Sequence, residues 1–146
     1  MNWSSLTPRE RDALVAEKVM GWVIDPGACH DDPTEIHTAF LFDPAQYPDA
    51  YPSVSHGLRP ERSDQFVPHY TTQIARAWEV VEKMQSMNHQ QDIHIQCLHG
   101  KWDVSMCHFE RNEEQMEWGD WTINAPTAPE AICKAALRAV GVKIED

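Results

Sequence analysis

The sequence predicts an α+β protein, because three stretches have helical periodicity and one stretch between the second and the third alternates like a β-hairpin. Its 146 residues fit a single domain, and we expect that domain to span residues 1–146. A chain of this length buries enough apolar surface to fold without a disulfide or a metal. A long proline-rich segment, residues 23–65, is inserted between the first two helices.

The first and third helices begin with a capping signal. TPRE (7–10) offers a capping Thr, a Pro for the first helical position and a Glu that can complete a capping box. We expect this helix to cover residues 8–20 and to end at Gly21. TAPE (127–130) repeats the arrangement ahead of an alanine-rich stretch, whose small side chains would allow close packing on a sheet.

The second helix follows FVPHYTT (66–72). We expect Thr71 or Thr72 to cap it, which would leave the amides behind Thr71 free for an anion. Apolar residues recur behind this start at helical spacing, and Trp78 is expected to point inward. The expected buried stripe is Ile74, Ala77, Trp78, Val81 and Met84.

Strand signals lie mainly between the second and third helices. Residues 92–110 alternate on either side of Gly100 and predict a hairpin, and MEWGDWTIN (116–124) predicts a third strand. Cys97 and Cys107 could then meet across the hairpin. Within the proline-rich segment, only EIHTAFLFD (35–43) has the pattern of a strand.

Three blocks of the chain resemble the phage and prophage proteins that carry the phage ABA sandwich domain. The blocks are LTPRERDALVAEKVMGW (6–22), VPHYTTQIARAWEVVEKM (67–84) and APTAPEAICKAALRAVG (125–141). The resemblance implies a small sandwich of about three helices packed on a short antiparallel sheet, and a phage or prophage protein in the bacterial cytoplasm. Most members of the family are hypothetical proteins. Relatives have a shorter segment between Trp22 and Phe66.

The net charge of −11 restricts the partners. An acidic surface repels phosphate backbones, so we expect no DNA or RNA binding. The acidity either keeps the protein soluble or imitates a nucleic acid for a basic partner. No apolar stretch is long enough to span a membrane, and the N-terminus lacks the pattern of a signal peptide. We therefore expect a cytoplasmic protein with free thiols.

Catalytic and metal-binding signatures are missing from the sequence. It contains no P-loop, no G-x-G-x-x-G and no nucleophile elbow, and Cys29 has His30 and Asp31 only as sequence neighbours. His94 and Cys97 are three residues apart in a strand and so face opposite sides, which argues against a zinc site. We expect no catalytic residue, no metal and no cofactor.

Ligand binding is the remaining chemistry. Aromatic side chains at the ends of elements can stack on a base, and arginines can hold a phosphate. The alternative is that these aromatic residues form the edge of the core. The expected ligand-binding residues are Trp22, Arg59, Arg62, His69, Tyr70, Thr71, Arg76, Trp102, Trp118 and Trp121.

The leading hypothesis is a non-enzymatic phage accessory protein that counters host defence. It would act as a sponge that sequesters a nucleotide-type immune signal, a cyclic nucleotide or a relative of cyclic ADP-ribose. The alternative is an acidic inhibitor that binds a host protein, and the third hypothesis is a hydrolase of the same signals. We also expect a homo-oligomer, because a small fold that buries a whole nucleotide often borrows a second subunit.

Overall fold

The computed structural model describes residues 1–24, 41–42, 67–87, 92–111 and 116–145. Side chains are described within these ranges except at residues 24, 41–42, 107–111 and 116–122. The elements are η1 (Trp3–Ser5), α1 (Pro8–Val15), η2 (Ala16–Met20), β1 (Val23–Ile24), β2 (Leu41–Phe42), α3 (Ile74–Met87), β3 (Asp92–Leu98), β4 (Lys101–Arg111), β5 (Met116–Ala125) and α4 (Ala128–Ala139).

The three long strands form one antiparallel sheet in the order β3-β4-β5, as the alternation predicts. His99 and Gly100 both have positive φ (52° and 77°), which is the geometry of a tight hairpin turn. The register places Cys97 opposite Trp102 and Cys107 opposite Asp92. The expectation that the two cysteines meet across the hairpin is therefore wrong, because they lie at opposite ends of the β3–β4 ladder.

One face of the sheet is covered by α4 and the other is polar. Val104 and Met106 are completely buried on the covered face. On the opposite face His94 and Gln96 are exposed, and Asn124 donates a hydrogen bond to Asp103 across the strands. The alternation of apolar and polar residues thus gives the sheet one core face.

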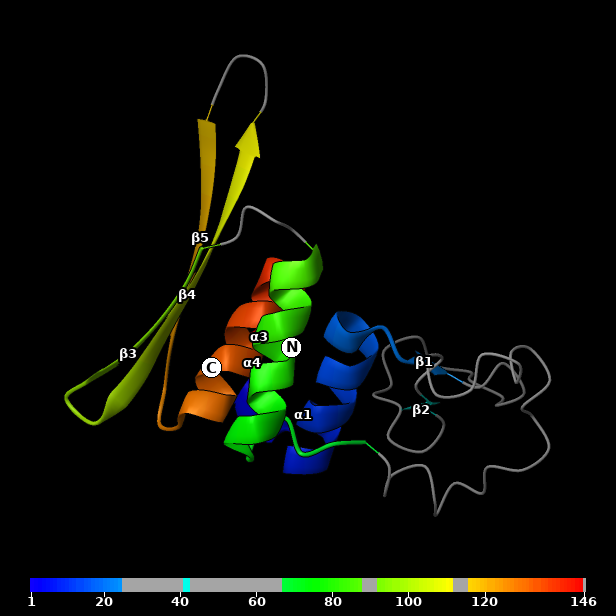
Figure 1. Cartoon of the computed structure of the whole chain (residues 1–146). Helices are drawn as coiled ribbons and strands as arrows, with labels where there is room; N and C mark the ends of the chain where they lie inside the picture. Colours follow the sequence, from blue (N-terminus) through cyan, green and yellow to red (C-terminus); the bar gives the residue numbers. More distant parts are fainter. Residues whose placement is uncertain (25–40, 43–66, 88–91, 112–115, 146) are drawn as a thin grey trace.

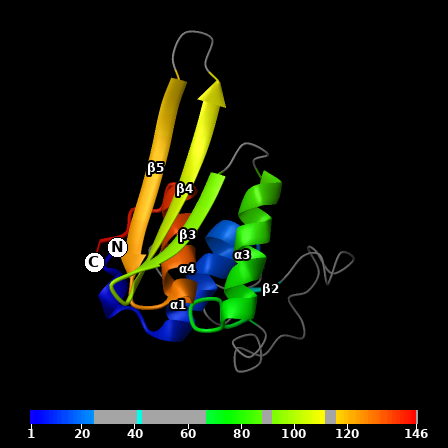
Figure 2. The same cartoon turned by 60° about the vertical axis from the view of Figure 1, so that its left-hand side comes forward.

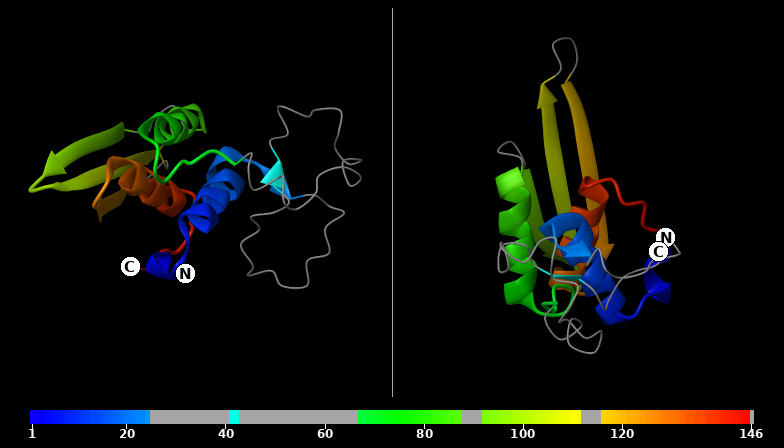
Figure 3. Two further views of the ribbon diagram at one scale, coloured as in Figure 1. Left: turned by 90° about the horizontal axis from the view of Figure 1, so that it is seen from below. Right: turned by 90° about the vertical axis from the view of Figure 1, so that its right-hand side faces the viewer.

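Helix α4 is the centre of the molecule. It packs against β4 and β5 on one side and against α3 and η2 on the other (Figures 1 and 3). Its alanines at 131, 135 and 136 have no exposed surface, so the small side chains allow the close packing that the sequence predicts. Gly141 (φ 89°) takes the left-handed conformation after the helix, which is the usual role of a glycine at this position. The result is a small α+β sandwich.

Helix α1 begins as the sequence predicts. The hydroxyl of Thr7 accepts from the backbone N–H of Glu10, and the Glu10 carboxylate accepts from the backbone N–H of Thr7 at 2.7 Å, which completes the capping box. The helix continues through the π-helical turn η2 and ends at Gly21 (φ 80°). The expected span of residues 8–20 is thus helical throughout, although its second part is more loosely wound.

The predicted buried stripe of α3 is wrong at two positions. Ala77, Val81 and Met84 are buried as expected, but Trp78 is 51% exposed and Ile74 is 55% exposed. Val80, which is not part of the predicted stripe, is buried instead and has no exposed surface. The buried face is therefore centred on the side of the helix where Ala77, Val80 and Met84 lie, and Trp78 falls outside it.

The N-terminal segment is fastened to α4 through Trp3, which is buried. Its indole N–H donates to the Glu130 carboxylate at 2.7 Å, while the Arg11 guanidinium and the Lys134 ammonium lie 5.0 and 5.7 Å from the ring centroid. Glu130 also forms an ion pair with Arg11, so its carboxylate does not complete a capping box with Thr127. Asn2 pairs with Glu145, and the two ends of the chain lie side by side (Figures 2 and 3).

The β4–β5 hairpin extends past the rest of the sheet. Pairing with β3 ends at Cys107, whereas β4 and β5 stay paired as far as Arg111 and Met116. The two strands therefore project beyond the helices (Figures 1 and 2). Within the proline-rich segment, β1 and β2 form a short antiparallel pair, so the expected strand at 35–43 is described only at residues 41–42.

The capping box makes stability depend on pH. The pKa of Glu10 is lowered from its usual value of 4.5, first by the backbone N–H of Thr7 and then by its hydroxyl. A carboxyl whose pKa is lower in the folded state stabilises the fold above pH 4.5, and that contribution disappears as the pH falls through the folded pKa. Glu10→Gln removes the charge but keeps an oxygen that can accept from Thr7, so it should lower the free energy of unfolding by about 0.3–0.5 kcal/mol at pH 7.

Urea denaturation of the wild type, Glu10→Gln and the exposed control Glu82→Gln at pH 7 and pH 3 measures this effect. The difference between the wild type and Glu10→Gln should shrink at pH 3, and Glu82→Gln should behave like the wild type at both pH values. A difference that is equally large at pH 3 would show that the Glu10 carboxylate does not supply the stabilisation.

Candidate functional site

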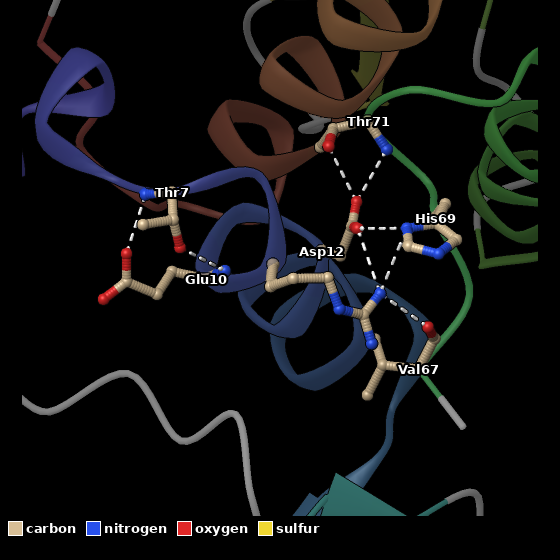
Figure 4. A network of polar contacts seen from close by, with 7 residues as sticks. Thr7, Glu10, Asp12, Val67, His69 and Thr71 are labelled. Atoms are coloured by element: carbon tan, nitrogen blue, oxygen red, sulfur yellow. Dashed lines mark hydrogen bonds and ion pairs between the residues drawn. The ribbon is translucent and has the colours of Figure 1, made fainter. Parts of the chain in front are cut away.

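The centre of the candidate site is a buried carboxylate. Asp12 lies on α1 among apolar neighbours and has no exposed surface. Its Oδ1 accepts two hydrogen bonds from Thr71, one from the backbone N–H at 2.8 Å and one from the hydroxyl at 2.7 Å (Figure 4). A buried carboxylate is tolerated only when it is paired and hydrogen-bonded, so these bonds tie α1 to the turn that precedes α3.

The second oxygen of Asp12 faces two basic side chains (Figure 4). Oδ2 lies 3.3 Å from a terminal nitrogen of Arg9 and 3.4 Å from Nδ1 of His69. The same Arg9 nitrogen donates to the carbonyl of Val67 at 2.9 Å and lies 3.3 Å from His69 Nδ1. When Nδ1 carries a proton, it can donate to Asp12. When Nδ1 carries no proton, it can accept from Arg9. The ring can therefore form a hydrogen bond within the network in either tautomer.

His69 is the accessible member of this network. Its side chain is 51% exposed, whereas the Arg9 side chain is 25% exposed and Asp12 is buried. Because Nδ1 faces the network, we expect the opposite edge of the ring to be the edge offered to a ligand. Chemically, the arrangement offers an oriented imidazole backed by a carboxylate.

The expected anion site behind Thr71 is wrong. Helix α3 begins at Ile74, later than expected, and Thr71 is buried rather than capping the helix. Its amide donates to Asp12, and the amides of Thr72 and Gln73 both donate to the carbonyl of His69, at 3.4 and 2.9 Å. The Thr71 amide is thus occupied by Asp12, and the first two amides behind it, those of Thr72 and Gln73, are occupied by the turn itself.

Other expected ligand residues are part of the core or of local pairs. Tyr70 and Trp22 are buried, and Trp102 packs partly buried against the core. Arg76 forms an ion pair with Glu79 on its own helix. These four residues do not converge on a common site, which favours the alternative that the aromatic side chains belong to the core and its edge.

The remaining expected residues cannot be placed as side chains. Trp118 and Trp121 occupy positions of β5 opposite Phe109 and Met106, in the part of the sheet where side chains are not described. Arg59 and Arg62 lie outside the described residues, as does Cys29. Of the expected set, the structure brings together His69 and Thr71, and it adds Arg9 and Asp12.

Arg9 and Asp12 were not among the expected site residues. The available signal is the aspartate in RDALV (11–15), a charged residue on a helix face that is otherwise apolar. Such a residue is almost never fully buried without partners. The pattern could have identified Asp12 as a partnered carboxylate, but its partners Thr71 and His69 are far away in the sequence and only the fold reveals them.

Cys133 lies inside α4 and is unsuited to nucleophilic chemistry. Burial raises the pKa of its thiol well above the usual value, and the negative charges of Asp12 and Glu130 raise it further. The thiolate is the reactive form of cysteine, so Cys133 stays protonated and inert at neutral pH.

In the described part of the chain, no three His, Cys, Asp or Glu side chains converge as metal ligands. Among the helices of that part, none has the length and apolar character required to cross a membrane.

The fold and this network define a class of protein: a small α+β sandwich whose first helix is tied to the turn before α3 by a buried carboxylate. The family model of the phage ABA sandwich domain matches residues 13–137, and the chain belongs to that family. The match runs from α1 to α4 and includes the whole sheet. No curated protein and no solved structure matches the chain.

All three blocks that carry the family resemblance meet in these contacts. The first block supplies Asp12 and Arg11, the second supplies His69 and Thr71, and the third supplies Glu130. The motifs by which the family is recognised are therefore used for joining α1, α3 and α4.

Removing the Asp12 carboxylate tests whether it joins α1 to the turn before α3. Asp12→Ala leaves the N–H and hydroxyl of Thr71 without their acceptor and should lower the free energy of unfolding by about 3–5 kcal/mol. Asp92→Ala at an exposed position of β3 is the matched control and should change it by less than about 0.5 kcal/mol. Chemical denaturation measures both values, and equal stability of the two variants would contradict a framework role for Asp12.

Proposed function

We propose that this phage-family protein is an accessory factor that binds a bacterial protein and carries out no reaction of its own. The observation that carries the proposal is a pair of exposed apolar residues on α3, Ile74 and Trp78, which we call the α3 ridge. The residues lie one helical turn apart, and each has more than half of its surface exposed.

The composition of the α3 ridge is typical of a protein interface. Aromatic residues are enriched at binding hot spots, and an exposed Trp offers a large area at a small loss of conformational entropy. The charges of α3 are mixed, since Glu79 is paired with Arg76 and Glu82 is followed by Lys83, but the whole chain carries a charge of −11. An apolar pair on a strongly acidic protein suits a partner whose own surface is basic.

Chemistry by the buried groups has less support. The Asp12 carboxylate already accepts hydrogen bonds from Thr71, and the Cys133 thiol is held in its protonated form. Both groups serve the packing of α1, α3 and α4. This supports a protein that acts by binding.

The α3 ridge can be tested without disturbing the fold. Trp78→Ala and Ile74→Ser should change the free energy of unfolding by less than about 0.5 kcal/mol, because both side chains are largely exposed. A tagged wild-type protein should retain one host protein from a bacterial lysate, and complex formation should weaken as salt increases. The double variant should lose that protein.

Met87→Ala is the matched control, since Met87 is equally exposed but lies at the other end of α3. It should retain the host protein with unchanged affinity in a calorimetric titration of the purified pair. If the double variant also retains the host protein, the α3 ridge is not part of the interface. If the wild type retains no host protein, the result counts against the proposed function.

A second candidate is a sponge for a nucleotide-type immune signal, in which the protein binds a cyclic nucleotide or a relative of cyclic ADP-ribose without converting it. The observation that favours it is His69, the one expected ligand residue whose described side chain is both half exposed and held in place by long-range contacts. A fixed imidazole offers one well-directed hydrogen bond to a small polar ligand.

Calorimetry with a panel of cyclic nucleotides and cyclic ADP-ribose isomers tests the sponge. His69→Ala should lower the free energy of unfolding by less than about 1 kcal/mol, because the side chain that contacts Asp12 is half exposed, and should abolish any binding seen with the wild type. His94→Ala on the polar face of the sheet is the control. Tyr70 is not a suitable probe, since truncating a buried aromatic residue unfolds the protein's core.

Three outcomes separate the candidates. Heat from a ligand that is recovered intact after denaturation supports a sponge, whereas recovery of a cleaved product supports a hydrolase of the same signal. No heat from any member of the panel excludes both and leaves the protein-binding proposal. Light scattering on the same samples measures whether the protein is a homo-oligomer, as expected for a sponge, or a monomer.

A further inference from the structure

The C-terminal end of α4 borders a surface hollow whose position differs from that of the α3 ridge and of His69. It encloses about 360 Å³ and is lined by Arg138, Gly141, Val142, Lys143 and Ile144. We call it the α4 hollow. Its volume is within the range of roughly 300–1,000 Å³ that is usual for sites that bind small molecules.

The two cationic residues of the α4 hollow lack acidic partners among the described residues. Arg9, Arg11 and Arg76 each form an ion pair with a carboxylate, although the chain is strongly acidic. The Arg138 guanidinium instead donates to the backbone carbonyl of Ile144 at 3.2 Å, and the described residues provide no carboxylate within ion-pairing distance of Lys143. Two positive charges thus border one hollow with their charge uncompensated by a direct partner.

The wall of the α4 hollow is held in place. Ile144 is buried, and the bond from Arg138 to its carbonyl fixes the guanidinium against the wall. The next residue, Glu145, exchanges backbone hydrogen bonds with the N-terminal segment, donating to Met1 and accepting from Trp3, both at 2.9 Å. A site whose walls are held before binding loses less entropy when a ligand enters.

The C-terminal end of a helix disfavours anions, and the effect is weaker where its last carbonyls accept hydrogen bonds. Here the turn after α4 supplies the donors: the amide of Gly141 donates to Arg138 and that of Val142 donates to Leu137, both at 2.9 Å. The two cationic side chains are therefore not needed as caps for these carbonyls. Their charge is available to a ligand.

We propose that the α4 hollow binds the phosphate group of a small phosphate monoester. The planar fork of Arg138 matches the oxygens of a phosphate, and one of its donors remains engaged with Ile144 to orient it. Lys143 adds a mobile point charge at the rim, and the apolar surfaces of Val142 and Ile144 leave room for the small organic part of the ester. The net charge disfavours a nucleic acid as the ligand.

The proposal is independent of the protein-binding function, because it uses neither the α3 ridge nor His69. Its test is a titration of isotope-labelled protein, followed by NMR, with inorganic phosphate, ribose 5-phosphate and a nucleoside monophosphate at constant ionic strength. The amide signals of residues 141–144 should shift and reach saturation. Equal affinities would identify free phosphate as a sufficient ligand, and tighter binding of the esters would show that the organic part enters the hollow.

Substitutions then assign the roles. Arg138→Gln should weaken binding by roughly tenfold to a hundredfold, because a charge-assisted hydrogen bond is lost, and Arg138→Lys should restore only part of the affinity. Arg138→Gln together with Lys143→Gln should abolish saturation. Lys101→Gln, which removes an exposed cation on β4, is the matched control and should leave the affinity unchanged.

A variant that leaves the wall intact distinguishes a loss of charge from a loss of structure. Glu145→Gln removes the negative charge of the residue that follows the wall and leaves its backbone hydrogen bonds in place, so the phosphate should bind at least as tightly as to the wild type. Absence of saturable shifts at residues 141–144 at millimolar phosphate or ester overturns the proposal. So does an unchanged affinity in the double variant, or an equal loss in Lys101→Gln.

Discussion

The structure depends on one buried carboxylate. Asp12 has no contact with solvent, and removing such a charge from water is costly by several kcal/mol, even after the protein relaxes around it. The fold offsets this cost with two hydrogen bonds from Thr71 and with the nearby charge of Arg9, and the His69 ring lies beside the same carboxylate. Since Thr71 is 59 residues away in the sequence, its two hydrogen bonds to Asp12 can form only when α1 and the turn before α3 are in their native places.

This constraint explains why the family blocks contain so little free functional chemistry. Their polar residues are occupied in capping and joining helices: Thr7 and Glu10 cap α1, Asp12 joins α1 to the turn of Thr71, and Glu130 joins α4 to Trp3. The proposed binding sites therefore lie on surfaces that these contacts do not occupy. The α3 ridge and the α4 hollow are two such surfaces, and each lies at the outer edge of the packed helices.

The sequence predicted the elements better than it predicted the site. Capping signals, glycine exits and strict alternation are local, so the helix that starts at Pro8, the hairpin at Gly100 and the third strand could all be derived. The expected site failed because exposure is not local. Tyr70 has the residue type of a ligand contact but is buried, and Trp78 has the periodicity of a core residue but is exposed.

By itself, the sequence determined the α+β class, the family, the caps of α1 and the positions of the strands, because each of these depends on neighbours within one or two turns or on the match of whole blocks. Only the tertiary structure decided which polar groups are still available. The amide of Thr71 donates to Asp12 and those of Thr72 and Gln73 donate to His69, whereas Arg138 borders the α4 hollow without an acidic partner among the described residues. The physical reason is that a hydrogen-bonding group is satisfied by whatever the fold brings beside it, and sequence spacing does not contain that information.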